Sequence, residues 1–228
     1  MMPREPSVPL KARSEKLMPI EGSPSPIPDD HGPTGHTGAV AANITYGSAI
    51  PGEAELRLCG DIGEGKRAVE LGVSEWLNSI ALARAGARAI AVDPRHDRIA
   101  ELRERADRAE VNVQCHETGL ADLGDITSGT CDLVVAAQTL GDVDDLGRLL
   151  RQVHRILEPS MPFVISTPHP FQSVSADRHY GVGERSIGEW FTALGRANFR
   201  VDQLIELGVG TAGPTPTTLV LRARKEGS

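Results

Sequence analysis

Residues 67–94 read RAVELGVSEWLNSIALARAGARAIAVDP and carry the main fold signal of this chain. A short apolar run ends at Glu70-Leu71-Gly72, a helical pattern follows, and a second apolar run ends at Asp93. This order predicts a strand, a helix and a second strand, with an acidic side chain closing each strand. Parallel strands direct their carboxyl ends to one crevice, where open α/β sheets bind small ligands. Asp93 follows Glu70 by 23 residues, so we expect it where a bound nucleotide would present its ribose hydroxyls.

The same alternation continues along the rest of the chain and predicts an α/β fold. We expect this fold to be a Rossmann-like doubly wound sheet, mostly parallel, with an antiparallel C-terminal hairpin strand. The expected strands cover 67–72, 88–93, 111–115, 131–137, 163–167, 200–207 and 217–222, the last two joined by the turn 208–216. The expected helices cover 53–60, 75–86, 95–109, 142–157 and a segment that begins with the capping-box pattern Ser186-Ile187-Gly188-Glu189. We expect the inner face of that last helix to be Ile187, Trp190, Phe191, Leu194 and Ala197.

Composition narrows the classes of function. The 228 residues carry a formal net charge of −7, which argues against a broad nucleic-acid footprint and predicts no nucleic-acid partner. The three cysteines lie far apart without the spacing of metal ligands, so we expect no metal site and a reducing, cytoplasmic location. No window approaches the roughly 20 apolar residues of a membrane span, and the first residues do not have the pattern of a signal peptide. We therefore expect no membrane partner.

The N-terminal residues differ from the rest of the chain. Eight of the 16 prolines fall before residue 34, and the first aromatic residue is Tyr46. Such a segment buries too little apolar surface to offset the entropy lost on ordering, so we expect residues 1–40 to be a disordered Pro-rich tail. The α/β domain should then span residues 41–225. The glycine-rich turn Asp61–Lys66 precedes the first strand, so we interpret it as a connection, because phosphate loops follow a strand.

The element order and three sequence regions resemble the class I S-adenosylmethionine-dependent methyltransferases, and within them the bacterial group related to ubiquinone and menaquinone methyltransferases. The resemblance covers residues 45 to 225 in element order. It is sharpest in Ala54–Leu58 with Lys66–Gly72, in Asn78–Ala83 with Ala91–Pro94, and in Cys131–Val135 with Val153–Pro159 and Val164–Pro168. It implies a methyltransferase that uses S-adenosylmethionine and acts on a small-molecule or protein acceptor, of which we expect the small molecule.

The resemblance also implies a set of cofactor-binding residues. The acid of the first strand would orient the methionine end of the cofactor, and the following loop would approach it by its backbone, where residues without a bulky Cβ allow close contact. Asp93 would accept hydrogen bonds from the ribose, the loop after the third strand would flank the adenine, and Ala137 with Gln138 would form the floor. The implied cofactor-binding residues are Glu70, Gly72, Val73, Ser74, Asp93, Pro94, Gly119, Leu120 and Ala137.

Departures from the family pattern keep other interpretations open. The glycine loop is reduced to Gly72, followed by Val73-Ser74-Glu75-Trp76, and Gly119 stands where the family often has an acid. A catalytically inactive binding or regulatory protein with the same fold is therefore the alternative function. Glu70 could instead pair with a neighbouring lysine or arginine, and Asp93 could simply open a turn and cap a helix.

His169 is the candidate catalytic residue. It lies between two prolines after the fifth expected strand, where an imidazole could take a proton from the acceptor. The alternative is that it only packs the turn. His154 and His116 are interpreted as a helix residue and a loop residue without a catalytic role. Tyr46 could close over the methionine moiety or pack in the core, and residues 172–185, with His179 and Tyr180, could form a substrate lid. No sequence pattern indicates an oligomeric state.

Overall fold

A seven-stranded mixed sheet runs through the computed structural model, which describes residues 43–174, 179–210 and 213–227. The strand order is β3-β2-β1-β4-β5-β7-β6. The first five strands are parallel, and β7 pairs antiparallel with both β5 and β6. The strands are β1 (Arg67–Leu71), β2 (Arg88–Asp93), β3 (Val113–Glu117), β4 (Leu133–Ala137), β5 (Pro162–Pro168), β6 (Phe199–Leu207) and β7 (Thr218–Lys225). The predicted fold class, including its antiparallel C-terminal hairpin, is confirmed.

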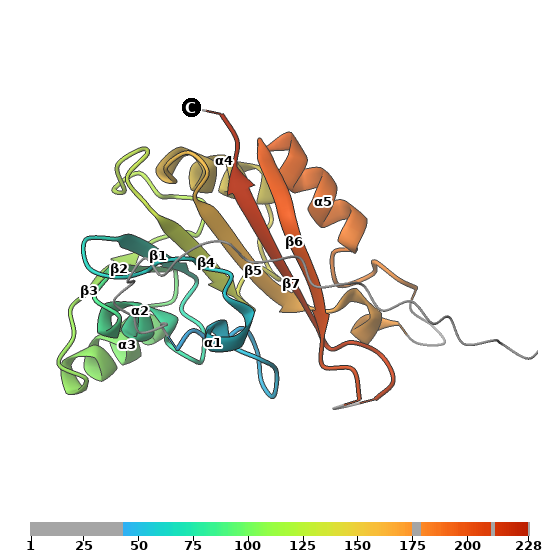
Figure 1. Cartoon of the computed structure of the whole chain (residues 1–228), viewed down its shortest axis with the longest axis horizontal. Coiled ribbons are helices and arrows are strands. Elements are labelled where there is room, and N and C mark those ends of the chain that lie inside the picture. The colour runs from blue at the N-terminus through green and yellow to red at the C-terminus, as the bar shows by residue number, and fades with distance from the viewer. Residues whose placement is uncertain (1–42, 175–178, 211–212, 228) are drawn as a thin grey trace, which may run out of the picture. The chain divides into compact units, whose positions relative to one another are not determined.

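Helices cover both faces of this sheet (Figure 1). The helices α1, α2 and α3 pack on one face, and α4 and α5 pack on the other. Their bounds are α1 (Glu53–Leu56), α2 (Asn78–Arg84), α3 (His96–Arg108), α4 (Leu146–Ile156) and α5 (Ile187–Arg196), with a 3₁₀ turn over Pro170–Ser173. None of the helices in the described ranges is long and apolar enough to cross a membrane. The expected N-terminal tail lies outside the described residues.

The strand order creates a switch point between β1 and β4. From β1 the chain proceeds outward to β2 and β3, and it then returns to place β4 on the other side of β1. The chain therefore leaves the carboxyl end of β1 toward one face of the sheet and that of β4 toward the other face. This divergence opens a crevice between the two strand ends. Gly72, directly after β1, donates its N–H to the carbonyl of Val92 in β2 at 2.8 Å, so the first loop starts from the middle of the sheet.

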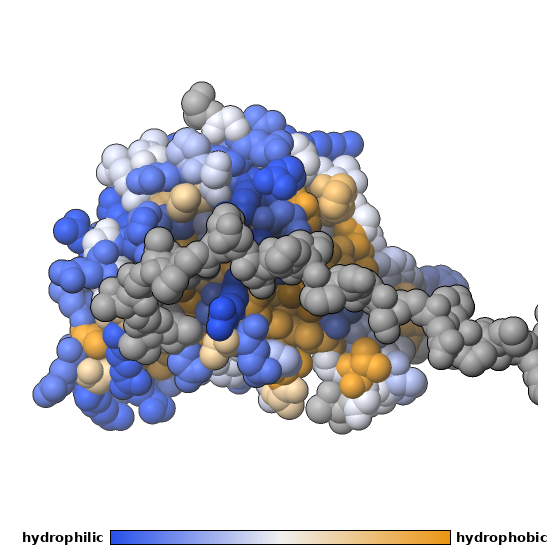
Figure 2. All heavy atoms as spheres, in the orientation of Figure 1, coloured by the Kyte–Doolittle hydropathy of each residue, from blue (hydrophilic) through white to orange (hydrophobic). Residues whose placement is uncertain are grey.

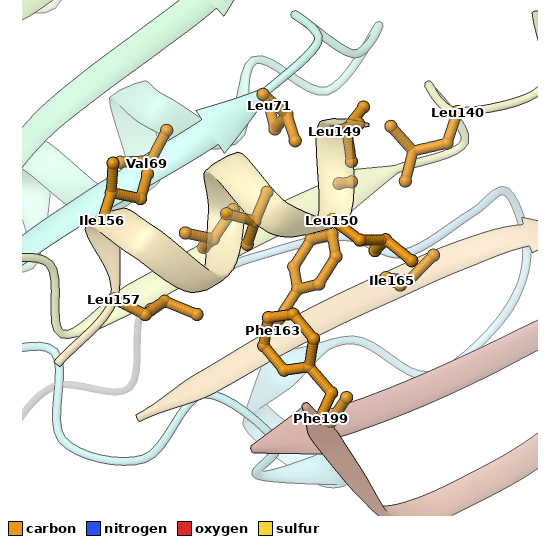
Figure 3. Packing of buried hydrophobic residues seen from close by; sticks show 14 of the residues in the cluster. Val69, Leu71, Leu140, Leu149, Leu150, Ile156, Leu157, Phe163, Ile165 and Phe199 are labelled. Carbon is orange, nitrogen blue, oxygen red and sulfur yellow. The ribbon is translucent and has the colours of Figure 1, made fainter. Parts of the chain in front are cut away.

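The larger core lies between the sheet and the helices α4 and α5 (Figure 3). The apolar stripe of α4 fills it with Leu149, Leu150, Val153 and Ile156, which are all fully buried. Its periodicity of three and four residues brings these side chains to one face, as the sequence predicts. On the side of β2, β3 and α3, hydrophilic residues cover most of the face seen in Figure 2.

Three helices are clearly shorter than the sequence pattern predicts, whereas α3 differs from its predicted range by one residue at each end. The chain leaves α1 at Arg57, which has a φ of +50°, because the Glu53 carboxylate accepts the next two N–H groups, those of Leu58 and Cys59. The helix α2 starts after Leu77, whose φ is also +50°. The helix α4 starts after residue 145 because the Asp145 side chain accepts the N–H of Arg148 and caps it there.

The capping-box prediction at α5 is confirmed, and one residue of its predicted inner face is wrong. Ser186 Oγ accepts the N–H of Glu189, and the Glu189 carboxylate accepts the N–H of Ser186. Trp190 and Leu194 are buried as predicted, whereas Phe191 is 58% exposed. Phe191 directly follows Trp190, and consecutive helical residues point about 100° apart, so only one of the two can face the core centre.

Candidate functional site

A cavity of about 760 Å³ lies at the carboxyl ends of β1, β2 and β4. Its size falls in the range of small-ligand pockets. Eight of the nine residues predicted to bind the cofactor line this cavity, although they come from four separate segments of the chain. They are Gly72, Val73, Ser74, Asp93, Pro94, Gly119, Leu120 and Ala137. Gln138, predicted to form part of the floor, also lines it.

Gly72 is held in a conformation that only glycine adopts without strain. Its φ is +79°, and a Cβ added at this position would lie 2.4 Å from the Cβ of Thr139. Thr139 cannot simply move away, because its hydroxyl donates to the carbonyl of Leu71 at 2.6 Å. Gly72 is the glycine that remains from the family pattern. It lies where the chain after β1 passes directly against Thr139 in the loop after β4, so there is no room for a side chain.

Glu70 is the predicted cofactor residue that does not line the cavity. Its side chain is fully buried beneath the loop and accepts four hydrogen bonds, three on Oε1 and one on Oε2. The donors are the N–H and hydroxyl of Ser74 and the N–H groups of Asn78 and Ser79. The last two belong to the first turn of α2, whose N-cap residue has no side-chain cap of its own. Glu70 thus satisfies N–H groups that the start of a helix leaves free.

These contacts bear on both interpretations made from the sequence. The alternative of a lysine or arginine partner is wrong, because the partners of Glu70 are backbone N–H groups and one hydroxyl. The role of Glu70 in orienting the cofactor stays a prediction, which from this position can act only through the loop that the carboxylate holds. Ser74 is small, as the family pattern requires, but its hydroxyl hydrogen is already donated to Glu70 at 2.7 Å.

Asp93 closes β2 at the cavity, and an arginine accompanies it there. Its Oδ1 accepts from the N–H and Nε of Arg95, and its Oδ2 accepts from the N–H of Val73 and from Nη2 of Arg95, all within 2.7–2.9 Å. Burial by itself would raise the pKa of Asp93, but the hydrogen bonds from Arg95 and Val73 hold it below its ordinary value. The carboxylate is therefore ionised at neutral pH and can accept hydrogen bonds.

Sequence reasoning missed the two arginines of this wall. Arg95 and Arg98 both line the cavity, and both reach the carbonyl of Val73, at distances of 3.3–3.4 Å. Arg98 also pairs with Glu101 on α3 at 2.8 Å. The sequence did contain a signal for Arg95. It follows Asp93, the acid that ends β2, by two positions, and this spacing brings its guanidinium within reach of the Asp93 carboxylate.

Trp76 and Glu75 replace glycines of the family loop and leave the cavity open. Both residues line it without filling it. Trp76 is half-buried and packs against the hydrophobic cluster on the α1 and α2 face. It also borders a second cavity of about 560 Å³ against α2 and α3, which none of the predicted site residues lines.

The loop after β4 supplies a further wall that the sequence analysis placed in a helix. Because α4 begins only at Leu146, the preceding residues are free to border the cavity. Gln138 opens this loop with a φ of +61° and donates from its side-chain amide to the carbonyl of Tyr46 at 3.3 Å. The residues of this wall are Gly141, Asp142, Val143, Asp144, Asp145 and Arg148, with Arg148 paired to Asp122 of the loop after β3. Three carboxylates in this wall make the mouth of the cavity acidic.

His169 lies outside the cavity lining and is fully buried. Its Nδ1 accepts the N–H of Phe171 at 3.2 Å, so the ring proton lies on Nε2, which faces the Glu206 carboxylate at 2.8 Å. Both ring nitrogens are therefore engaged. The catalytic role of His169 stays a prediction, and these contacts favour the alternative in which it packs the turn after β5.

Other residues considered from the sequence also lie away from the cavity. Tyr46 is fully buried and donates its hydroxyl to Glu53 at 2.5 Å, which favours packing over closure on a ligand. His116 belongs to β3 and is not a loop residue. Tyr180 packs on Phe171, and residues 175–178 of the expected lid lie outside the described residues. Within the described ranges, no group of three potential ligand side chains is arranged to hold a metal ion.

Comparison with known proteins finds relatives of this region. Residues 69–165 match the methyltransferase domain family. A ubiquinone biosynthesis O-methyltransferase from Azorhizobium caulinodans is 29% identical over 155 residues, which are 66% of this chain and 59% of that protein. The chain therefore spans less than two thirds of the length of this curated relative.

Solved methyltransferases share the fold. An S-adenosylmethionine-dependent methyltransferase from Mesorhizobium loti matches with a TM-score of 0.60 and 24% identity, over 71% of this chain and 92% of that one. The 1,6-didemethyltoxoflavin-N1-methyltransferase of Burkholderia thailandensis, solved with 1,6-didemethyltoxoflavin and S-adenosylhomocysteine bound, matches with a TM-score of 0.58 and 21% identity, over 75% of this chain and 76% of that one. These likenesses show the shared fold.

Proposed function

We propose that this chain is a class I S-adenosylmethionine-dependent methyltransferase, which binds S-adenosylmethionine in the 760 Å³ cavity and transfers its methyl group to a small-molecule acceptor. One observation carries the proposal. Eight residues selected from the sequence for this cofactor, in four separate segments, border a single cavity at the switch point of the sheet.

The chemistry of the lining fits the cofactor. Gly72 brings backbone without a side chain to the edge of the cavity, and Asp93 offers an ionised carboxylate for ribose hydroxyls. Leu120, Ala121 and Val143 add apolar surface suited to an adenine ring, and the carboxylates of Asp142 and Asp144 suit a positively charged ligand. The acidic mouth thus complements a sulfonium cation.

Catalysis in this site would depend on position more than on a strong base. When bound, the cofactor supplies an electrophilic methyl group on its sulfonium sulfur. The residues of this chain would hold that methyl group and the acceptor in line, and such alignment alone corresponds to effective molarities of about 10⁵–10⁸ M in favourable cases. An acceptor proton could pass to a carboxylate of the loop after β4, of which Asp142 lines the cavity.

A small-molecule acceptor is supported by the shape of the site. The cavity is concave and bounded by several loops, which suits a compact ligand beside the cofactor. The Burkholderia methyltransferase, whose fold is shared, has 1,6-didemethyltoxoflavin bound beside S-adenosylhomocysteine. The acceptor class of this chain can be found by a screen of phenols, amines and carboxylic acids with cofactor labelled in its methyl group.

Calorimetric titration with S-adenosylhomocysteine tests the proposal directly. The Asp93→Ala variant should bind more weakly by about 1–3 kcal/mol, the effect of losing a charged hydrogen-bond partner. Asp107→Ala, an exposed change on α3 away from the cavity, is the matched control and should bind as the unchanged protein does. No heat and no thermal shift at millimolar ligand would contradict the proposal. Binding without turnover of any acceptor class would instead favour the inactive alternative.

A further inference from the structure

The carboxylate of Asp93 already accepts four hydrogen bonds, two on each oxygen. A carboxylate offers about four lone-pair sites, so a further donor has to share them with the present ones. Two donors are backbone N–H groups, from Val73 and Arg95, which the fold holds in place. The other two are Nε and Nη2 of the Arg95 guanidinium, at 2.9 and 2.8 Å. A ribose diol also needs two acceptor sites, so it competes with the guanidinium.

The two partners of this ion pair differ greatly in exposure. The Asp93 side chain is 1% exposed, whereas the Arg95 side chain is 55% exposed and lines the cavity. Arg95 can therefore turn into solvent without moving the backbone, while Asp93 cannot. Its remaining contact in the cavity, to the carbonyl of Val73, is long at 3.3 Å. The carboxylate of Asp97, which favours the charged form of Arg95, is a nearby alternative partner.

We propose that Arg95 acts as a latch on the ribose site: its guanidinium occupies the Asp93 carboxylate and is displaced when the adenosine part of a ligand binds. This inference rests on the proposed function, because it assigns a ribose to Asp93. It makes Arg95 a residue that sets the affinity of the site without contacting the transferred methyl group. Every binding event must break an ion pair with two hydrogen bonds, so the latch lowers the affinity.

Arg98 provides a matched control for this role. It lines the same cavity and reaches the same carbonyl of Val73, but its ion-pair partner is Glu101 and it makes no hydrogen bond to Asp93. Removing Arg98 changes the positive charge of the wall by the same amount as removing Arg95. Only the removal of Arg95 frees the carboxylate of Asp93.

Calorimetric titration with S-adenosylhomocysteine separates these effects. Arg95→Ala should bind about 3- to 10-fold more tightly than the unchanged protein, the factor expected for a partly exposed, bidentate ion pair. Arg98→Ala, which leaves Asp93 paired with Arg95, should bind no more tightly than the unchanged protein. Arg95→Lys cannot form the bidentate pair, so its affinity should lie between those of the unchanged protein and Arg95→Ala. The 2′-deoxy analogue of the same ligand should lose most of the gain in Arg95→Ala, because it cannot use the freed carboxylate fully.

The outcomes distinguish the latch from the function on which it rests. If the unchanged protein binds S-adenosylhomocysteine and Arg95→Ala binds it equally well or more weakly, the latch is overturned and the proposed function stands. An equal gain in Arg98→Ala would also overturn it, since the effect would then be one of charge alone. Absence of binding in every variant, with circular dichroism showing them folded, would overturn both the latch and the proposed function.

Discussion

Replacing Glu70 with glutamine tests whether this buried carboxylate holds the first turn of α2. In the native protein, Oε1 accepts from the N–H and hydroxyl of Ser74 and from the N–H of Asn78, while Oε2 accepts only from the N–H of Ser79, at 2.8 Å. A glutamine would keep its oxygen in the place of Oε1. Its NH₂ group would then face the N–H of Ser79, so that two donors oppose each other in a buried site.

The expected cost follows from these contacts. Losing one charge-assisted hydrogen bond costs about 1.5–3 kcal/mol, and the three remaining bonds weaken because their acceptor is no longer charged. The lost charge also interacted favourably with the amino end of α2. We therefore expect the free energy of unfolding to fall by about 2–4 kcal/mol. In a domain of this size that corresponds to a Tm lower by roughly 4–16 °C.

Differential scanning calorimetry and urea unfolding measure this effect. Glu75→Gln is the matched control, since it makes the same chemical change at an exposed position of the same loop and should alter stability by less than about 0.5 kcal/mol. A Glu70→Gln protein with an unchanged Tm would refute the reasoning. If that protein also bound S-adenosylhomocysteine much more weakly, Glu70 would act on cofactor binding through the loop and not on the stability of the helix.

Three further outcomes are expected. Gly72→Ala should destabilise the protein by about 2 kcal/mol or more and abolish binding of S-adenosylhomocysteine in calorimetry, because the added Cβ meets Thr139 at 2.4 Å in a backbone conformation with φ of +79°. Asp202→Asn should flatten the dependence of stability on pH in acid, measured by urea unfolding between about pH 5 and pH 2. Burial alone would raise the pKa of Asp202, but hydrogen bonds from Arg222 and Arg224 hold this pKa below its ordinary value. The stabilisation by Asp202 is therefore present above the unfolded pKa of about 4 and is lost as the pH falls through the native pKa. A variant whose stability depends on pH in the same way as that of the unchanged protein would contradict this. Cys131 and Cys59 should resist alkylation by iodoacetamide at pH 8 until the protein unfolds, because both are buried and burial raises the pKa of Cys131 to about 11. Mass spectrometry of the native protein measures the labelling. If either cysteine is labelled as fast as the partly exposed Cys115, the core opens in the native protein.

Features that depend on neighbouring residues were predictable from the sequence. The bounds of β2 match the prediction exactly at Arg88–Asp93, because a continuous apolar run in a parallel sheet is bounded by polar residues on both sides. The capping box at Ser186 was readable for the same reason, since both of its partners lie within three residues. The prediction failed at the end of α1 and the start of α2, where the carboxylates of Glu53 and Glu70 accept N–H groups five to nine residues further along the chain, a contact that no short pattern specifies. It also failed at Phe191, because two adjacent residues competed for one direction.

The sequence by itself determined the order of strands and helices along the chain, the fold class and eight of the residues that line the cavity, because apolar periodicity and the ends of strands depend on neighbouring residues. Only the tertiary structure decided what the two strand-end acids contact. Glu70 turns beneath the loop to the start of α2, and Asp93 faces the cavity with Arg95 across it. The physical reason is that a carboxylate takes whichever donors the packing brings near it, and no spacing along the chain specifies those donors.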